Sequence, residues 1–288
     1  MANKKLKAPV NIPVEKIHPF EGHPYKVLDN DEMNNLIESI QNKGVILPIV
    51  VRPLENTNDE YEIISGHRRL RASVKAGLET VPALIYAVSR DEAAIMLVDS
   101  NLHREHILPS ERAFAYKLKM EAMSRQGYRS DLTSCQFGTK LRTDEIIAEN
   151  STDSARQIQR YIRLTNLIPE LLDLVDEERI AFTPAVELSY LNEVEQADLV
   201  EEIRVCDATP NLSQAQRLRA ISREEGLTPE HIGEILSEEK ANQREKIKIP
   251  AERIRKYFPK SYTTEQIEEA IIKICESRYR ARQGRDAR

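Results

Sequence analysis

A change of periodicity near residue 91 constrains the fold of this 288-residue chain more than any other feature. Before it, short apolar strand patterns alternate with short helical patterns, and after it only helical periodicity remains. The chain therefore fits an α+β protein, in which a small α/β unit precedes an all-α region. At roughly 100 to 200 residues per domain, the length allows two or three cores.

Turn and cap residues divide the first part into elements. Asp29 and Glu32 have the spacing of a capping box and predict a helix that ends at Gly44. Strands are predicted at 45–52, 61–64 and 81–86, with Pro48 placing the first at a sheet edge or an irregularity, and a helix at 68–76.

The second part reads as helices joined by short loops. A helix is predicted at 109–123, a polar surface loop at 124–142, and later helices start at Thr183, around Leu212, and at Thr228 and Thr263. Val186, Leu188 and Leu191 are expected in the core. We expect domains at 1–105 and 106–205, a helical linker at 206–245 and a C-terminal helical module at 246–288.

Composition narrows the class of protein. Three cysteines without a CxxC pair indicate neither a disulfide framework nor a zinc site, which favours a reducing compartment. We find no export signal and no apolar run long enough to cross a membrane, and so expect a cytoplasmic, nucleoid-associated protein. The net charge of −5 means that any nucleic-acid contact must come from local basic patches.

One such patch lies between a predicted strand and helix, in the segment Ser65 to Arg71. Its backbone amides would lie at a helix N-terminus, where the helix dipole favours anions. Gly66 permits close backbone approach, and the guanidiniums of Arg68, Arg69 and Arg71 are bidentate donors for phosphate oxygens. The segment predicts a phosphate site; the alternative is a solvated start of a charged helix.

A second polar segment, Asp99 to Glu105, follows the α/β unit. Its amide, arginine and acids could assist a phosphate or a magnesium ion. His103 and His106 have the spacing of a metal pair but lack a third ligand.

Two short helical patterns, 143–148 and 154–164, have the spacing of a helix-turn-helix. Ile158, Tyr161, Ile162 and Leu164 can face inward, while arginines at i, i+4 and i+7 line an outer stripe. No acid lies between Ala155 and Ile168, whereas a merely solvated helix usually mixes charges. The expected DNA contacts are Ser154, Arg156, Gln157, Gln159, Arg160 and Arg163, with Arg156 and Gln157 at base edges and Arg160 and Arg163 on phosphates.

The C-terminal module carries an apolar stripe, Ile267, Ala270, Ile271 and Ile274, after a cap at Thr263. The stripe suits either packing in the same chain or self-association. Arg278 to Arg288 form a basic tail, either a nonspecific DNA contact or a solvated terminus.

Several of these segments together resemble the ParB/Noc family of partition proteins. The similarity covers roughly residues 10–200 and includes the GxRRxRA pattern at Gly66 and the NLxRE pattern at Asn101. The resemblance implies a ParB-like N-terminal domain, a helix-turn-helix domain, a homodimer and a ParA-type ATPase partner. It further implies that CTP with magnesium closes the dimer into a clamp on double-stranded DNA.

By position in the family pattern, Gly66, His67, Arg68, Arg69 and Arg71 would hold the triphosphate. Asn101 would ligate magnesium and Arg104 would contact phosphate. The family's acids are replaced by His67 and Ser100, its glutamine before Pro48 is Leu47, and its basic box survives as His23, Pro24, Tyr25 and Lys26. We therefore expect nucleotide binding with weak or absent CTPase turnover.

The best hypothesis is thus a sequence-specific DNA-binding protein that partitions a plasmid, another mobile element or a chromosome. The alternative is a transcriptional regulator of the same architecture that binds no nucleotide. A small-molecule kinase with the same N-terminal fold is a third reading, but the sequence offers no base or acceptor pocket for it.

Overall fold

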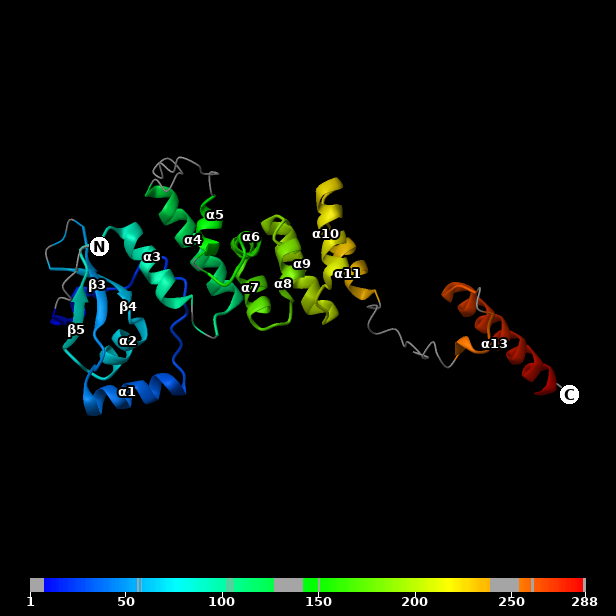
Figure 1. The fold of residues 1–288 in the computed structure, drawn as a ribbon, viewed down its shortest axis with the longest axis horizontal. Coiled ribbons are helices and arrows are strands. Elements are labelled where there is room, and N and C mark those ends of the chain that lie inside the picture. The colour runs from blue at the N-terminus through cyan, green and yellow to red at the C-terminus, as the bar shows by residue number, and fades with distance from the viewer. Residues whose placement is uncertain are drawn as a thin grey trace. The chain divides into compact units, whose positions relative to one another are not determined.

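The computed structural model describes residues 8–55, 57, 59–102, 104, 106–126, 142–149, 151–238, 254–259 and 262–286. The chain divides into two compact units, Met1–Glu238 and Glu239–Arg288. In the first unit, a sheet with its own helices precedes a series of helices (Figure 1). The predicted α+β class is confirmed, while the finer boundaries at 105, 205 and 245 stay a prediction.

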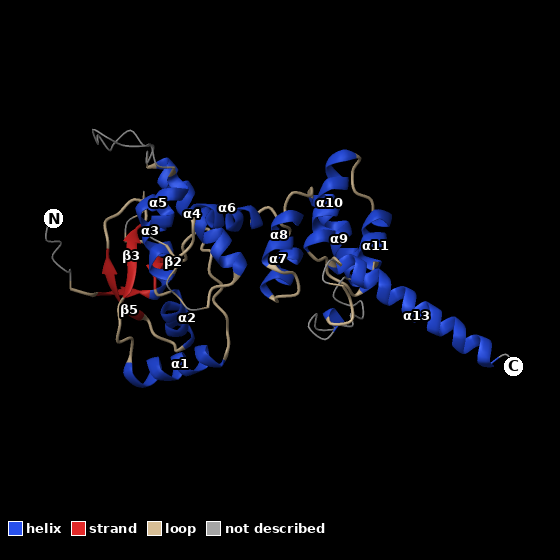
Figure 2. Ribbon diagram, turned by 45° about the vertical axis from the view of Figure 1, so that its right-hand side comes forward, coloured by secondary structure: helices blue, strands red, loops and turns tan. Residues whose placement is uncertain are grey.

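The sheet has five strands in the order β1-β5-β3-β4-β2. Neighbouring strands are antiparallel in β1/β5 and β3/β4 and parallel in β5/β3 and β4/β2. The strands are β1 (Val10–Pro13), β2 (Ile17–His18), β3 (Ile49–Pro53), β4 (Tyr61–Ser65) and β5 (Thr80–Ile85), and a short 3-10 helix, Val14–Lys16, joins the first two. Figure 2 shows that the strands gather at one end of this unit.

Three of these strands were predicted, but β3 begins at Ile49 instead of residue 45. Pro48 cannot donate a ladder hydrogen bond, which delays the strand. Sequence reasoning missed β1 and β2, because β1 contains Asn11 and a terminal Pro13 and β2 has only two residues.

Helices cover both faces of the sheet. The helices are α1 (Asp31–Lys43) and α2 (His67–Lys75) on one side, and α3 (Arg90–Asn101) and α4 (Pro109–Arg125) on the other. Adjacent residues of β4 divide between the two layers, since Ile63 packs in the sheet core with Leu70 of α2, whereas Ile64 packs with Leu97 of α3. This alternation is what a pleated strand imposes.

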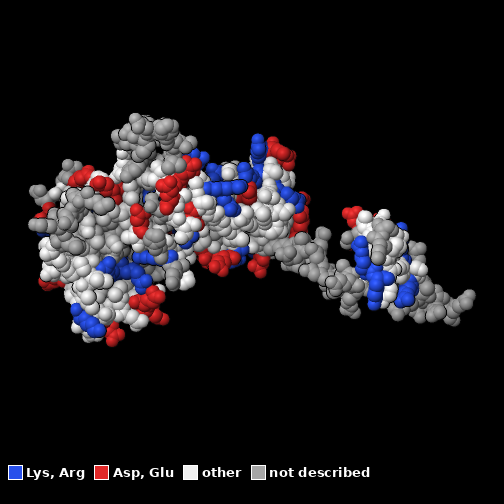
Figure 3. Space-filling view, viewed as in Figure 1, with Lys and Arg blue, Asp and Glu red and all other residues white. Residues whose placement is uncertain are grey.

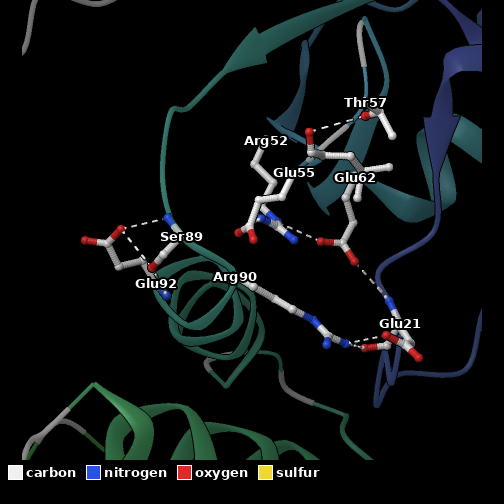
Figure 4. A network of polar contacts seen from close by, with 9 residues as sticks. Glu21, Arg52, Glu55, Thr57, Glu62, Ser89, Arg90 and Glu92 are labelled. Atoms are coloured by element: carbon white, nitrogen blue, oxygen red, sulfur yellow. Dashed lines mark hydrogen bonds and ion pairs between the residues drawn. The ribbon is translucent and has the colours of Figure 1, made fainter.

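A buried ion pair ties β3 to β4. Arg52 Nε lies 2.7 Å from Glu62 Oε2, and both side chains are about 5% exposed or less. The other oxygen of Glu62 accepts a hydrogen bond from the backbone of Glu21, whose side chain pairs with Arg90 of α3 (Figure 4). The charges thus join the sheet, the 19–22 segment and α3.

The helical part of the unit continues with seven helices in its described residues. They are α5 (Thr143–Glu149), α6 (Ala155–Leu164), α7 (Pro169–Asp176), α8 (Phe182–Leu188), α9 (Glu193–Cys206), α10 (Leu212–Glu224) and α11 (Pro229–Ser237). Their core includes Val186, Leu188 and Leu191, as expected. Thr183 does not cap α8, since the helix begins at Phe182 after Ala181 and the Thr183 hydroxyl accepts a hydrogen bond from Arg160.

The second unit contains α13 (Thr264–Asp286). Thr263 and Gln266 exchange hydrogen bonds at its start, which confirms the predicted cap. Of the apolar stripe, Ile267 is buried but Ile274 is 54% exposed. Of the loop predicted at 124–142, residues 124 and 125 belong instead to α4, and residues 127–141 lie outside the described residues, as do the side chains beyond Arg278. None of the helices described here has the length and apolarity to cross a membrane.

Candidate functional site

The predicted phosphate loop is a sharp turn between β4 and α2. Gly66 has φ 102° and ψ 24°, a left-handed conformation that favours glycine. A Cβ at this position would lie 2.9 Å from the Cγ2 atom of Ile49 and 3.2 Å from a guanidinium nitrogen of Arg69. The glycine therefore lets the turn pack against β3, and His67 becomes the first residue of α2.

The three arginines of the loop diverge to three different partners. Arg68 pairs with Glu32 at 2.9 Å. Arg71 makes a bidentate pair with Asp29 at 2.6 and 2.9 Å, and Lys75 adds a contact of 2.8 Å to the same carboxylate. These cations hold the pKa of Asp29 well below its usual range.

Arg69 has a different role from its neighbours. Its Nη1 atom donates to the backbone carbonyls of Leu47 and Pro48, ahead of β3. Burial lowers the pKa of Arg69. Arg69 thus connects the 44–48 loop to α2 by hydrogen bonds. Arg68 and Arg71 connect the start of α1 to α2 by ion pairs.

The sequence pattern predicted Asp29 as the N-cap of α1, and this prediction is wrong. Asn30 is the N-cap residue, and its side chain accepts a hydrogen bond from the backbone of Met33 at 3.1 Å. Asp29 is one residue too early, which leaves its carboxylate available to α2.

His67 joins an aromatic cluster that no local pattern predicts. Its ring stacks on His23 with centroids 3.7 Å apart, and His23 lies edge-on to Tyr25 at 5.6 Å. The guanidinium of Arg104 lies over the Tyr25 ring at 5.6 Å. Burial lowers the pKa of His67 to about 3, and the nearby His23 and Arg104 act in the same direction.

Two polar atoms of this cluster are buried without a hydrogen-bond partner among the described residues. They are His67 Nε2 and Tyr25 Oη. Buried polar groups are usually hydrogen-bonded, so these two atoms have unused hydrogen-bonding capacity. His67, Tyr25 and Arg104 thus come together at the predicted site, and the sequence signal for Tyr25 was its place in the His23–Lys26 segment.

The predicted magnesium ligand points back into its own helix. Asn101 is buried, and its Nδ2 atom donates to the Leu97 carbonyl at 2.7 Å and to the Ser100 hydroxyl at 3.2 Å. The Asp99 carboxylate is paired with the buried Lys119 at 2.5 Å. Asp99 is therefore paired, Glu105 lies outside the described residues, and the described residues contain no group of three metal-binding side chains. His103 of the predicted metal pair lies outside the described residues.

Lys26 links the N-terminal segment to the helical part of the unit. Its Nζ lies 3.2 Å from Asp176 and 3.4 Å from Asp173, both of α7. Asp176 also accepts hydrogen bonds from the backbone and hydroxyl of Ser110, at the start of α4. Sequence reasoning missed this contact, because its partners are about 150 residues apart.

Helices α5 and α6 pack as the predicted helix-turn-helix. Ser154 caps α6 by accepting a hydrogen bond from the backbone of Gln157. Ile158 packs with Ile147 of α5 and Tyr116 of α4 in one core cluster. The Gln159 amide donates a hydrogen bond to Asp144 of α5 at 3.0 Å. This contact joins α6 to α5.

The arginine stripe of α6 lies along α8. Arg156 is exposed. Arg160 donates to Thr183 and its guanidinium lies 4.9 Å from the centre of the Phe182 ring, which also packs on Tyr161. Phe182 could not be inferred as a partner of Arg160, because it belongs to another helix. That the arginines of α6 contact DNA stays a prediction.

The far end of the stripe meets an exposed ring. Arg163 lies 3.9 Å and Arg219 of α10 lies 3.5 Å from the centre of the Tyr190 ring. Arg219 also pairs with Glu187 at 2.7 Å, and Arg163 donates to the Ser189 carbonyl. Lys and Arg side chains gather over this part of the unit (Figure 3).

Solved structures with a similar chain include two of C-terminally truncated ParB from Caulobacter crescentus. One, complexed to the centromeric parS site, is 22% identical with a TM-score of 0.43, over 73% of this chain and 98% of that chain. The other, complexed with CTP-gamma-S, is 25% identical with a TM-score of 0.32, over 69% and 99%.

Sequence comparisons give closer matches. A nucleoid occlusion protein of Listeria innocua is 32% identical over 195 residues, which span 67% of this chain and 62% of that protein. A probable chromosome-partitioning protein ParB of Pseudomonas putida is 40% identical over 105 residues, 36% of each chain. The aligned part thus spans less than two thirds of these relatives. Residues 2–102 match the ParB N-terminal domain, and the chain as a whole is similar to nucleoid occlusion and chromosome-partitioning proteins.

Proposed function

We propose that the chain binds a specific site on double-stranded DNA through α5 and α6. The observation that carries this proposal is the arginine stripe of α6, which lies on a helix held from behind by α4 and α5. Arginines supply both bidentate contacts to guanine edges and phosphate contacts. Arg156 and Gln157, near the start of α6, are the proposed base readers, and Ser154, Gln159, Arg160 and Arg163 are proposed to support or extend the contact.

Two arginine substitutions test the division of roles on α6. Arg156→Ala is expected to relax base preference by about 1–3 kcal/mol at one position, because a base contact is lost. Arg160→Ala is expected to lower the slope of log affinity against log salt by about 0.9, because one phosphate contact is lost. Selection of bound duplexes and fluorescence anisotropy measure these effects, with Arg204→Ala as control, since the Arg204 side chain on α9 is 67% exposed. An unchanged slope for Arg160→Ala would remove its phosphate role.

The same proposal assigns CTP to the start of α2. The match of residues 2–102 to the ParB N-terminal domain supports this assignment. We propose that Gly66, His67, Arg68, Arg69, Arg71 and Arg104 surround the nucleotide phosphates. In the structure Arg71 and Arg68 form ion pairs with Asp29 and Glu32, respectively. Exposed ion pairs contribute about 0–1 kcal/mol each, so a triphosphate can replace these carboxylates at little cost.

We further propose that magnesium binds together with the nucleotide phosphates and that Asn101 is its protein ligand. The ion would neutralise phosphate charge. Because Asp99 is paired with Lys119 and His67 replaces an acid, we propose binding with little or no CTP hydrolysis.

Calorimetry with CTP and magnesium tests the nucleotide site. Arg71→Ala is expected to weaken binding at least several-fold, since a bidentate donor is lost. Asp29→Asn is expected to strengthen binding, because the competing carboxylate is gone. Lys43→Ala, an exposed change on α1, is the control. Absence of heat in both the wild type and Asp29→Asn would eliminate CTP from the proposal.

In the cell, we propose that nucleotide and DNA together close a homodimer into a clamp that serves partition with a ParA-type ATPase, at the nucleoid in the cytoplasm. One observation favours the alternative, a regulator without nucleotide: all three loop arginines already have protein partners. Genome-wide mapping separates the two. A broad region of bound DNA indicates a sliding clamp, and a sharp peak indicates static binding.

A further inference from the structure

The group Arg163, Tyr190 and Arg219 extends beyond the helix-turn-helix, because only Arg163 belongs to α6 and Arg219 belongs to α10. We call these three residues the arginine–tyrosine clamp. Tyr190 is 45% exposed, even though two guanidiniums pack against its ring. The Arg219 side chain is 40% exposed. The clamp therefore lies at the surface of the protein, where a partner can reach it.

The charges of the clamp are not balanced. Both guanidiniums lie within 4 Å of one ring centre, so they are closer together than the Debye length of about 8 Å at physiological salt. Glu187 pairs with Arg219, but Arg163 contacts only the Ser189 carbonyl and the Tyr190 ring among the partners described, and its buried Nε has none. The clamp thus holds a net positive charge in a fixed position.

The clamp also continues the arginine stripe of α6 onto α10. Arg163 is the last arginine of the α6 stripe, at i+7 from Arg156, and Arg219 extends the row onto α10. We propose that the clamp binds the phosphodiester backbone of the DNA, so that α10 takes part in the interface and Tyr190 is a positioning residue for both guanidiniums. This inference rests on the proposed DNA binding by α6.

Stacking explains why a tyrosine serves this purpose. Arginine loses side-chain entropy when it binds a phosphate, and a ring that already fixes the guanidinium plane reduces that loss. The ring also leaves the edge of the guanidinium, where its N–H donors lie, available for phosphate oxygens. Glu187 is the group with which a phosphate would compete for Arg219.

A mixed-sequence DNA duplex is the probe, because backbone contacts do not depend on base sequence. Arg219→Ala and Tyr190→Ala are expected to weaken binding several-fold, and Arg219→Ala lowers the salt slope by about 0.9. Tyr190→Phe keeps the ring and is expected to retain wild-type binding. Glu187→Gln is expected to have the opposite effect and to strengthen DNA binding, because Arg219 loses the carboxylate that competes with phosphate.

The same helix offers matched controls. Arg217 of α10 pairs with Glu238 at 2.6 Å, and Arg217 is 49% exposed, but neither residue touches the clamp. Arg217→Ala and Glu238→Gln repeat the charge changes elsewhere and are expected to leave binding nearly unchanged. The inference is overturned if Arg219→Ala and Glu187→Gln behave like these controls while the wild type binds DNA. A wild type that binds neither the mixed-sequence duplex nor any duplex in the selection of bound duplexes overturns the proposed function together with the clamp.

Discussion

His67 shows how much the meaning of one residue depends on its surroundings. By its position in the family pattern it was expected at the triphosphate site, in place of an acid. In the fold its ring stacks on His23 beside Arg104, and burial together with these neighbours depresses its pKa to about 3. The imidazole is therefore neutral at physiological pH, and it can donate a hydrogen bond to a phosphate but cannot contribute a charge.

This depressed pKa predicts a loss of stability in acid. Between the unfolded pKa of 6.5 and the folded value of about 3, the unfolded chain binds the extra proton. The free energy of unfolding then falls as pH falls, by up to about 1.4 kcal/mol per pH unit from this group. Urea titrations at pH 7 and pH 5 measure the effect. His67→Gln is expected to lose less stability than the wild type over this interval, and parallel losses would show that His67 does not carry it.

The arginines of the loop mark the limit of sequence reasoning at this scale. Their number and place before a helix predicted a positive site, and the structure confirms the strand–glycine–helix turn. Their directions depend on Asp29, Glu32 and the Leu47 carbonyl, which are more than 20 residues away. Local spacing contains no information about such partners.

At the scale of elements, the buried Arg52–Glu62 pair fixes β3 against β4. Removing one member leaves an uncompensated charge in the core, which costs about 3–5 kcal/mol, whereas replacing both by apolar residues is often neutral. The pair therefore contributes to alignment of the two strands as much as to stability.

Glu62→Ala is accordingly expected to lower the free energy of unfolding by about 3–5 kcal/mol in urea titrations followed by circular dichroism. Glu55→Ala provides the control, since Glu55 contacts the same arginine but is 72% exposed, and a change below about 1 kcal/mol is expected. The double variant Arg52→Met, Glu62→Leu should recover much of the loss. Equal effects of the Glu55 and Glu62 substitutions would contradict this assignment.

Helices were predicted better than strands for a physical reason. A helix is signalled by its own caps and periodicity, as at Ser154, Thr228 and Thr263. A strand such as β1 exists because β5, about 70 residues later, completes its ladder. The helix α7 was missed despite Pro169 at its first turn, a signal that was present in the sequence.

At the scale of the first unit, α4 joins the parts that the sequence suggested were separate. Ala115 packs in the core with the sheet and α3, Tyr116 packs with α5 and α6, and Ala113 packs with the later helices. Asp176 adds a polar contact by holding both Ser110 and Lys26. Packing around α4 thus joins residues on both sides of residue 105, while the domain boundary expected there stays a prediction.

The aromatic residues around α6 also determine how this protein can be observed. The chain has ten tyrosines and no tryptophan, so its near-ultraviolet absorption and emission come mainly from tyrosine. Tyr116 of α4 packs against Tyr161 of α6, and Tyr190 lies at the end of the arginine stripe of α6. The intrinsic spectrum of the unmodified protein therefore contains a direct optical reporter of the surface proposed to meet DNA, and no dye or label is needed to follow it.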